Sequence, residues 1–419
     1  MHLSRCDKFN VQAWIKSFIV LFCASFLLSD SNSSNTQILI LIAHQSIIPL
    51  SICALLNYAL ITANRSMSYV LFFTITITSV LGLSKTLTGT HSESSLMVLF
   101  GVSFYTATLA YLCKSKQITF TSGFISSNPL LLVTGPIATS FKTLSYKSVR
   151  SRVKYYFPFV TIGVFLHQII ATPITNTQFL INKTDALSTI IYSLIFEIFV
   201  YTNFCGLSLI IYGIFGMLGI KVPLNFKQPF SSRNLIEFWR GWHISISVVL
   251  KELFYSPIKK VFGTSAAILG VFLSSALWHG VSINFLLWGL FHSLCFLLSI
   301  FLLKYNIKYI PTLVAIIAIP FARLLSSDDN IKRLASKLFF NYTDTSILFR
   351  LWGLGNLTKL ALLLGAIFIA SEWIFKNHKT FRKRNYKFYR LPYVQISLLA
   401  MIFLCIHNQG ISYAVYGQR

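Results

Sequence analysis

The apolar runs that recur along almost the whole chain constrain its fold more than any other feature. A transmembrane helix needs roughly 17–25 apolar residues, and a fold in water cannot cover so many such segments with polar surface. Eleven runs approach or exceed this length, at residues 12–29, 38–63, 68–83, 95–113, 155–174, 187–220, 264–281, 283–303, 309–325, 355–375 and 392–408. We therefore predict an all-α, polytopic transmembrane protein with about 11 spans, folded as one membrane-embedded domain over residues 1–419.

The charge balance fits the same class. Only 11% of the residues are charged, yet Lys and Arg total 36 against 11 Asp and Glu, for a net charge of +25. With the N-terminus in the cytoplasm, the basic clusters at 142–154, 221–260 and 376–390 fall on the cytoplasmic side, facing anionic membrane lipid. Because the aromatic residues mostly lie inside apolar runs, we expect no stacking surface for bases and no nucleic acid as a partner.

Motifs for several other activities are missing from the sequence. The seven cysteines form no CxxC pair, so neither a disulfide framework nor a metal site is predicted. The absence of GxxxxGK[ST], GxGxxG and GxSxG leaves nucleotide hydrolysis, dinucleotide binding and one type of serine hydrolase without support. Only Glu197 and Glu372 lie clearly within apolar spans. Ion-coupled transporters usually need intramembrane carboxylates to carry the ion, and two are few for that role.

Two apolar stretches are not simple spans. Residues 129–141 contain two prolines and a glycine and are predicted to form a re-entrant or interfacial segment. Residues 187–220 are long enough for one tilted helix or for a broken pair of helices around Gly206.

The segment 226–260 is the least transmembrane-like part of the second half of the chain. Read as one helix, it places Trp239, Trp242 and His243 on one face. An aromatic, histidine-bearing face flanked by Lys and Arg suits a cytoplasmic-side interface that lines a cavity. An interfacial amphipathic helix, whose tryptophans only anchor at headgroup depth, explains the charge and the spacing at least as well.

His279 lies in uninterrupted apolar sequence, where an ionisable side chain is costly and indicates a functional site. Its imidazole can act as a general base near neutral pH, and a neutral histidine that bonds between helices is the alternative. His292 follows in the next apolar run. We interpret His44, His167 and His407, which have no supporting pattern around them, as interhelical hydrogen-bonding residues.

Two histidine blocks and four further segments carry a family resemblance. FWRGWHISIS (238–247) is followed by LWHGVSINFLLWGLFHS (277–293). The other segments, in the family's order, are GVSFYTATLAY (101–111), LLLVTGPI (130–137), PLNFKQPFSS (223–232) and PFAR (320–323). The chain thus resembles the membrane-bound O-acyltransferase family, in the bacterial branch that acetylates alginate and other polysaccharides and is related to teichoic-acid D-alanyl transferases. The family-like core runs from about residue 100 to about residue 325.

The resemblance implies a membrane O-acyltransferase whose helices enclose a tunnel through the membrane core. His279 corresponds to the family's catalytic histidine, and His243 to a second histidine on the cytoplasmic side near the donor. Five matching positions would shape the tunnel: Trp239, Trp242, Trp278, Gly280 and Asn284.

Such an enzyme would take an activated acyl group from the cytoplasm and deliver it to a hydroxyl on the outer side. A histidine can deprotonate the hydroxyl or carry the acyl group transiently, and an apolar site limits hydrolysis of the thioester. Candidates for binding the phosphates of coenzyme A or a phosphopantetheine are Arg233, Arg240 and Lys251. Positive-inside bias explains these basic residues equally well.

Five positions depart from the family's pattern. Asn203 and Leu209 stand where acidic residues are common. Gly241 replaces an arginine, Ser293 replaces a glycine, and Glu252 lies where an aspartate is found. The two histidines are intact, so the departures bear on donor docking and on the identity of the acceptor.

We therefore expect transfer of acetyl from cytoplasmic acetyl-CoA to a hydroxyl of an extracytoplasmic or cell-surface polysaccharide, without a bound cofactor, in the plasma (inner) membrane. The alternative within the family is transfer of D-alanyl or another acyl group from a carrier protein to a cell-envelope polymer. Two alternatives lie outside acyl transfer: a transporter, and a non-catalytic scaffold that recruits an extracytoplasmic partner transferase. A partner of that kind would also complete the transfer if the chain is an enzyme.

Overall fold

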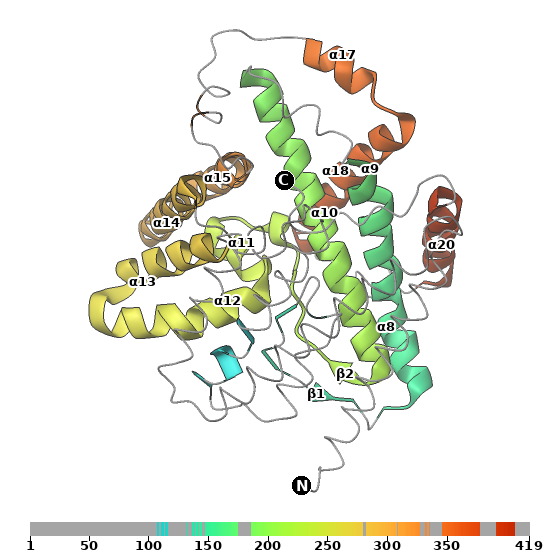
Figure 1. The fold of residues 1–419 in the computed structure, drawn as a ribbon, viewed down its shortest axis with the longest axis horizontal. Helices are drawn as coiled ribbons and strands as arrows, with labels where there is room; N and C mark the ends of the chain where they lie inside the picture. Colours follow the sequence, from blue (N-terminus) through green and yellow to red (C-terminus); the bar gives the residue numbers. More distant parts are fainter. Residues whose placement is uncertain are drawn as a thin grey trace, which may run out of the picture.

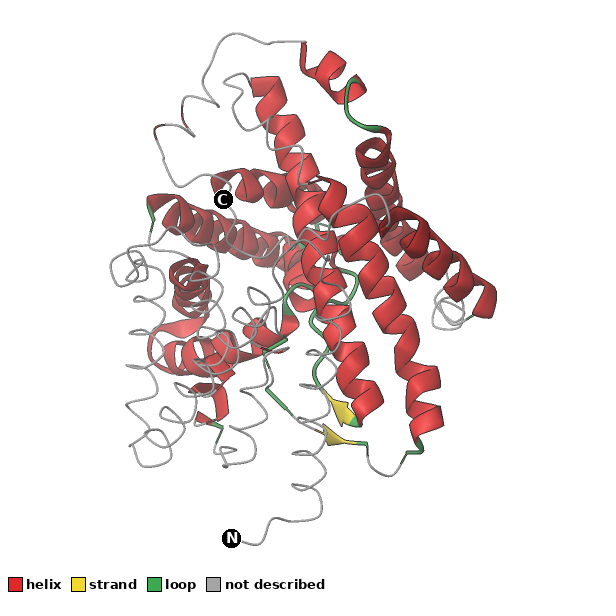
Figure 2. Cartoon of the chain, turned by 45° about the vertical axis from the view of Figure 1, so that its right-hand side comes forward, coloured by secondary structure: helices red, strands yellow, loops and turns green. Residues whose placement is uncertain are grey.

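The computed structural model describes residues 147–174, 186–279, 282–307, 309–326, 346–377 and 391–406, with scattered positions between 107 and 144 and at 332 and 335. Helices dominate this part of the chain, and its strands, β1 (Lys142–Thr143) and β2 (Ile220–Lys221), are two residues each (Figure 2). The predicted spans 12–29, 38–63 and 68–83 lie outside the described residues, as does most of 95–113.

Five helices in the described part are long and apolar enough to cross a membrane. They cover Val149–Ile174, Leu187–Leu218, Ile244–His279, Ile283–Lys304 and Asn356–Ile374. Two shorter apolar helices, Ile310–Ser326 and Pro392–Leu404, coincide with two further predicted runs. The all-helical, multi-pass class predicted from the apolar runs is thereby confirmed.

A closely packed pair of helices forms the centre of the described structure. α8 (Val149–Val164) continues through the π-helical turn η1 (Phe165–Ala171) into α9 (Thr172–Ile174) and runs antiparallel to α10 (Ala186–Leu218) (Figure 1). α10 is continuous, which decides between the two alternatives for this stretch. A Cβ at Gly206 would lie 2.8 Å from the carbonyl oxygen of Gly163, so Gly206 marks a contact between backbones rather than a break.

A hydrogen bond crosses this pair where the family pattern is altered. His167 Nδ1 of η1 lies 2.8 Å from Asn203 Oδ1 of α10, and both side chains are buried. The interpretation of His167 as an interhelical hydrogen-bonding residue is therefore confirmed. His44 and His407 lie outside the described residues.

The remaining elements surround the central pair. They are η3 (Pro229–Ser231), α11 (Leu235–Gly241), α12 (Ile244–Leu250), η4 (Lys251–Tyr255), α13 (Ser256–His279), α14 (Ile283–Lys304), α15 (Ile310–Ser326), α17 (Ser346–Trp352), α18 (Asn356–Asn377) and α20 (Pro392–Ile406). α13 is interrupted at Gly263, whose φ of 83° is left-handed. The predicted span 264–281 therefore begins at a real break, and the chain turns back there toward the centre (Figure 1).

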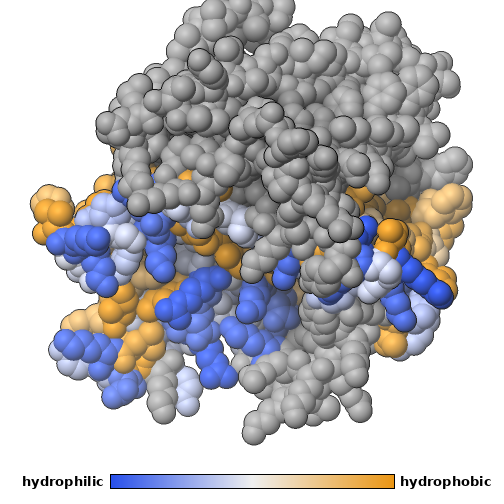
Figure 3. Space-filling model, turned by 90° about the horizontal axis from the view of Figure 1, so that it is seen from below, coloured by the Kyte–Doolittle hydropathy of each residue, from blue (hydrophilic) through white to orange (hydrophobic). Residues whose placement is uncertain are grey.

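Two contacts join the basic segments 142–154, 221–260 and 376–390. β1 pairs with β2 so that Lys142 lies opposite Lys221. Lys376, after the last turns of α18, pairs with Glu237 at 3.3 Å. Figure 3 views the face on which β1 and β2 lie, and hydrophilic side chains gather over its described part.

Candidate active site

Residues 225–243, the His243 segment, form several short elements instead of the single helix predicted for 226–260. α11 ends at Gly241, and His243 adopts a left-handed conformation with φ of 44° before α12 begins. The prediction of one continuous helical face was wrong because the backbone crosses itself here. Lys227 N–H donates to the Gly241 carbonyl at 2.8 Å, and a Cβ at Gly241 would lie 2.7 Å from the Lys227 carbonyl oxygen.

A buried network of neutral hydrogen bonds fixes the turn at His243. Asn225 Oδ1 accepts from Ser245 Oγ at 2.8 Å, and Asn225 Nδ2 donates to Ser208 Oγ of α10 at 3.2 Å. Ile137 N–H, from the predicted re-entrant stretch, donates to Ser245 Oγ at 3.0 Å. Uncharged hydrogen bonds to α10 and to the stretch around Ile137 therefore hold the turn from two sides.

Trp278 joins the two candidate catalytic histidines. The His243 ring stands at 87° to the Trp278 indole with centroids 6.0 Å apart, and the His279 ring lies 5.0 Å from the same indole at 68°. Trp278 is 7% exposed. The two sequence blocks thus meet at one buried aromatic side chain.

Other aromatic rings pack against the half-buried His279. Phe285 of α14 stacks on it at 6.1 Å, and Trp288 meets it edge-on at 5.8 Å. Trp288 also contacts His292 at 4.8 Å and Trp239 at 6.0 Å. An imidazole among such rings sits in a site of low polarity, where water competes weakly for a bound thioester.

Several polar atoms in this region have no hydrogen-bond partner among the described residues. Asn284 is fully buried, and neither its Oδ1 nor its Nδ2 is bonded. Trp239 Nε1 and His292 Nδ1 are buried and unbonded in the same way. Because an unmade hydrogen bond at a buried group is costly, these atoms are natural places for a substrate or a water molecule to bind. Asn284 lies one turn before Trp288, on the helix face that meets His279.

Burial keeps His243 neutral. Burial lowers the pKa of His243 from its ordinary value near 6.5 to about 4. At pH 7 its imidazole is therefore neutral and can accept a hydrogen bond.

An ion pair that the sequence did not place at the site lies beside Trp242. Arg323 Nε of α15 donates to Glu197 Oε2 of α10 at 2.6 Å, and the Arg323 guanidinium lies over the Trp242 ring at 5.7 Å. In the sequence, Glu197 is only an acidic residue inside an apolar span, and Arg323 is only part of the PFAR segment. The contact joins α15, α10 and the end of α11, and neither sequence position alone predicts it.

The other predicted site residues are placed as follows. Trp242 is buried against Tyr201 and Phe238. Arg233, Arg240 and Lys251 are exposed, which suits either donor binding or positive-inside bias, and Gly280 lies outside the described residues. Within the described part of the chain, no group of three or more His, Cys, Asp and Glu side chains could hold a metal ion.

Comparison with known proteins places the sequence in one family. The membrane-bound O-acyltransferase family matches residues 26–305, which is more than half of the chain. The chain is similar to the teichoic acid D-alanyltransferase of Bacillus subtilis, with 28% identity over 35% of this chain and 41% of that protein. It is also similar to the peptidoglycan O-acetyltransferase of Helicobacter pylori, with 35% identity over 32% of this chain and 27% of that protein.

A third relative is a probable alginate O-acetylase of Pseudomonas putida, with 36% identity over 22% of this chain and 20% of that protein. The matched stretches span less than half the length of each of these three relatives. The family match contains both histidine blocks, His243 and His279 included, and the predicted resemblance is confirmed. The chain belongs to the membrane-bound O-acyltransferase family.

Proposed function

We propose that this protein transfers an acetyl group from cytoplasmic acetyl-CoA to a hydroxyl of a cell-envelope polysaccharide. The observation that carries the proposal is the contact of His243 and His279 with the single indole of Trp278, inside the matched region of the family. Two relatives with acetyl-transfer names, to peptidoglycan and to alginate, support the choice of acetyl and of an envelope polymer.

His279 acts as the base in this proposal. It takes the proton of the acceptor hydroxyl while the oxygen attacks the thioester carbonyl; the carbon–sulfur bond then breaks, and the thiolate of coenzyme A receives the proton. Transient acylation of His279 itself is the second form of the same reaction. The aromatic rings of Phe285 and Trp288 limit hydrolysis by excluding water.

Two further side chains assist. Neutral His243 accepts a hydrogen bond on the donor side. The buried Asn284 amide donates to the carbonyl oxygen of the acyl group as negative charge develops there. Trp239, Trp242, Trp278 and Gly280 shape the tunnel, and Arg233, Arg240 and Lys251 attract the phosphates of the donor.

D-alanyl transfer from a carrier protein is the second candidate. The relative that covers the largest share of this chain among those described above is a teichoic acid D-alanyltransferase. A carrier protein would dock through its phosphopantetheine thioester, and the same two histidines would act on it.

The charge distribution of the sequence supports a setting in the plasma membrane. With the basic clusters of the sequence in the cytoplasm, acetyl-CoA would reach the site from within and the polysaccharide from outside. An extracytoplasmic partner transferase would pass the acetyl group onward to the polymer.

The donor is tested with purified full-length protein in nanodiscs. Labelled acetyl-CoA and an acyl-loaded carrier protein are offered separately, and release of the free thiol is followed over time. Thiol release from acetyl-CoA that is lost in His279→Ala supports the proposal. If the thiol is released only from the carrier thioester, D-alanyl transfer from a carrier protein replaces the acetyl-CoA proposal. If it is released from neither donor, both candidates are contradicted.

A further inference from the structure

One face of α18 lies along the His243 segment. Phe368, Glu372 and Lys376 are spaced at i, i+4 and i+8, so they line the same side of the helix. α18 follows the region matched by the family, which ends at residue 305. Each of the three side chains makes a different type of contact.

The first contact is aromatic. Phe368 stacks on Tyr201 of α10, with centroids 5.8 Å apart and planes at 24°. The Tyr201 ring, 1% exposed, packs in turn against Phe226, Phe230 and Trp242 at 5.8, 4.9 and 5.6 Å. Tyr201 therefore sits between α18 and three residues of the His243 segment.

The second contact is a buried carboxyl group. Glu372, 4% exposed, accepts hydrogen bonds from the Tyr201 hydroxyl and, at 3.1 Å, from the backbone N–H of Phe230. An acidic side chain within an apolar span is expensive, so its presence indicates a role. Here it holds the backbone of the His243 segment directly.

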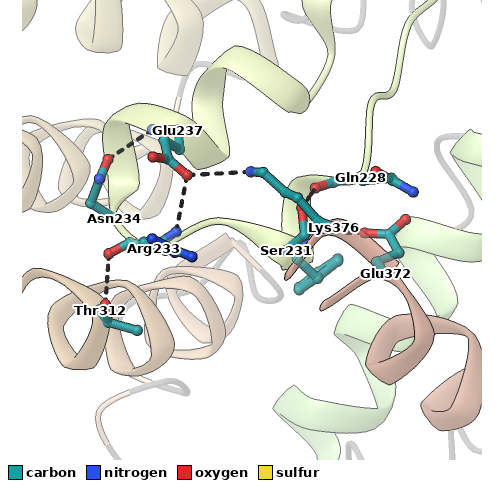
Figure 4. Close-up of polar contacts among 9 residues, drawn as sticks. Gln228, Ser231, Arg233, Asn234, Glu237, Thr312, Glu372 and Lys376 are labelled. Carbon is teal, nitrogen blue, oxygen red and sulfur yellow. Dashed lines mark hydrogen bonds and ion pairs between the residues drawn. The ribbon is translucent and has the colours of Figure 1, made fainter. Parts of the chain in front are cut away.

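The third contact is an ion pair at the surface. Lys376 Nζ lies 3.3 Å from Glu237 Oε2, and that same oxygen accepts from the Arg233 backbone N–H at 3.3 Å (Figure 4). Asn234 Oδ1 accepts from the Glu237 backbone N–H at 2.9 Å and caps α11. Lys376 thus reaches the start of the helix that carries Trp239 and Trp242.

The His243 segment depends on such external contacts. Its helices have three and seven residues, too short to be stable alone. It also contains two non-glycine residues in the left-handed region, Gln228 with φ of 47° and His243 with φ of 44°. Backbone conformations of this type persist only where surrounding structure fixes them.

We propose that Phe368, Glu372 and Lys376 are positioning residues that hold the His243 segment, and with it His243, against Trp278 for acyl transfer. The contacts are independent of the proposed function, and only their effect on catalysis rests on it. If the segment loosens, His243 leaves its place beside Trp278, and binding of the acyl donor weakens.

The test measures structure and activity separately on the full-length protein in nanodiscs. Hydrogen–deuterium exchange reports on the amides of residues 225–243, and acetyl-CoA kinetics report on the donor KM. In Glu372→Ala, we expect exchange in this segment to rise about tenfold and the donor KM to rise at least about fivefold. Glu372→Gln restores both, because its amide oxygen accepts from Phe230 and its amide nitrogen donates to Tyr201.

A milder variant guards against simple misfolding. Lys376→Met removes only the partly exposed ion pair and should raise the donor KM about threefold at an unchanged melting temperature. Glu237→Gln should add nothing to it, since both changes remove the same contact. Lys359→Met is the matched control, because Lys359 lies over the Trp352 ring in the first turn of α18, more than two turns before Phe368.

The outcomes are distinct. Unchanged exchange of residues 225–243 in Glu372→Ala, or an equal increase throughout the chain, overturns the positioning role. So does a KM that stays at the wild-type value while local exchange rises. If the wild-type protein does not use acetyl-CoA, the proposed function fails, and the exchange measurement alone still decides whether α18 holds the segment.

Discussion

The indole of Trp278 stands at 87° to the imidazole of His243, with ring centroids 6.0 Å apart. His243 precedes α12 and Trp278 lies in the last turn of α13, so their contact requires the chain between them to double back. The left-handed Gly263 supplies this reversal. Because His279 follows Trp278 directly, the reversal brings both histidines to one aromatic contact.

Loss of the Trp278 ring should impair both histidines together. Trp278→Leu removes the surface against which the two imidazoles pack, and small displacements of catalytic groups cost on the order of 10²-fold in rate. We expect kcat to fall by about this factor and Trp278→Phe to retain more activity than the leucine variant. Trp352→Leu, at a position 81% exposed, is the control and should leave kcat unchanged. A leucine variant with wild-type kcat would contradict the arrangement.

The lowered pKa of His243 predicts how stability depends on pH. The folded protein keeps this imidazole neutral down to about pH 4, whereas in the unfolded chain it takes up a proton near pH 6.5. The unfolded state therefore binds more protons between these values, and stability falls as the pH is lowered through this window. Thermal unfolding between pH 4.5 and 7.5 should show a weaker pH dependence in His243→Gln than in the wild type. An identical slope would show that His243 is not buried in this way.

Removing one partner of the Glu197–Arg323 ion pair should destabilise the protein more than replacing both partners together. Arg323→Met leaves the 5% exposed Glu197 carboxylate without its cation, and breaking a buried pair costs about 3–5 kcal/mol. Replacing both residues, as in Glu197→Gln with Arg323→Met, should recover much of this stability. Melting temperatures of the two single variants and the double variant in one detergent measure the effect. Simple additivity of the two losses would argue against a direct interaction.

Gly241 should not accept the arginine that the family pattern carries at this position. Even a Cβ would lie 2.7 Å from the Lys227 carbonyl oxygen, where the two backbone strands of the turn cross. We expect Gly241→Ala to lower the free energy of unfolding by about 1–3 kcal/mol. Gly355→Ala, where a Cβ would meet nothing within 4 Å, provides the comparison. Equal stability of the two variants would contradict the close crossing.

The sequence predicted the parts of this fold that depend on local patterns. Apolar length predicts the helices around α10 and α14, and the family resemblance of the two histidine blocks indicates His243 and His279, which both contact Trp278. The single helix through His243 was wrong, because helical periodicity carries no information about the crossing of Lys227 and Gly241. The links from Glu372 to Tyr201 and from Arg323 to Glu197 join residues more than a hundred positions apart, which one sequence cannot reveal.

The central claim is that His279 performs the chemistry of acyl transfer. It is tested most directly by supplying acetyl-labelled acetyl-CoA to purified wild type, His279→Ala and His167→Ala, and measuring free coenzyme A and protein-retained label. His167 is the matched control, a buried histidine that bonds to Asn203 and lies outside both histidine blocks of the sequence. The account predicts that turnover or label retention persists in wild type and His167→Ala and vanishes in His279→Ala. Turnover that survives in His279→Ala would contradict it.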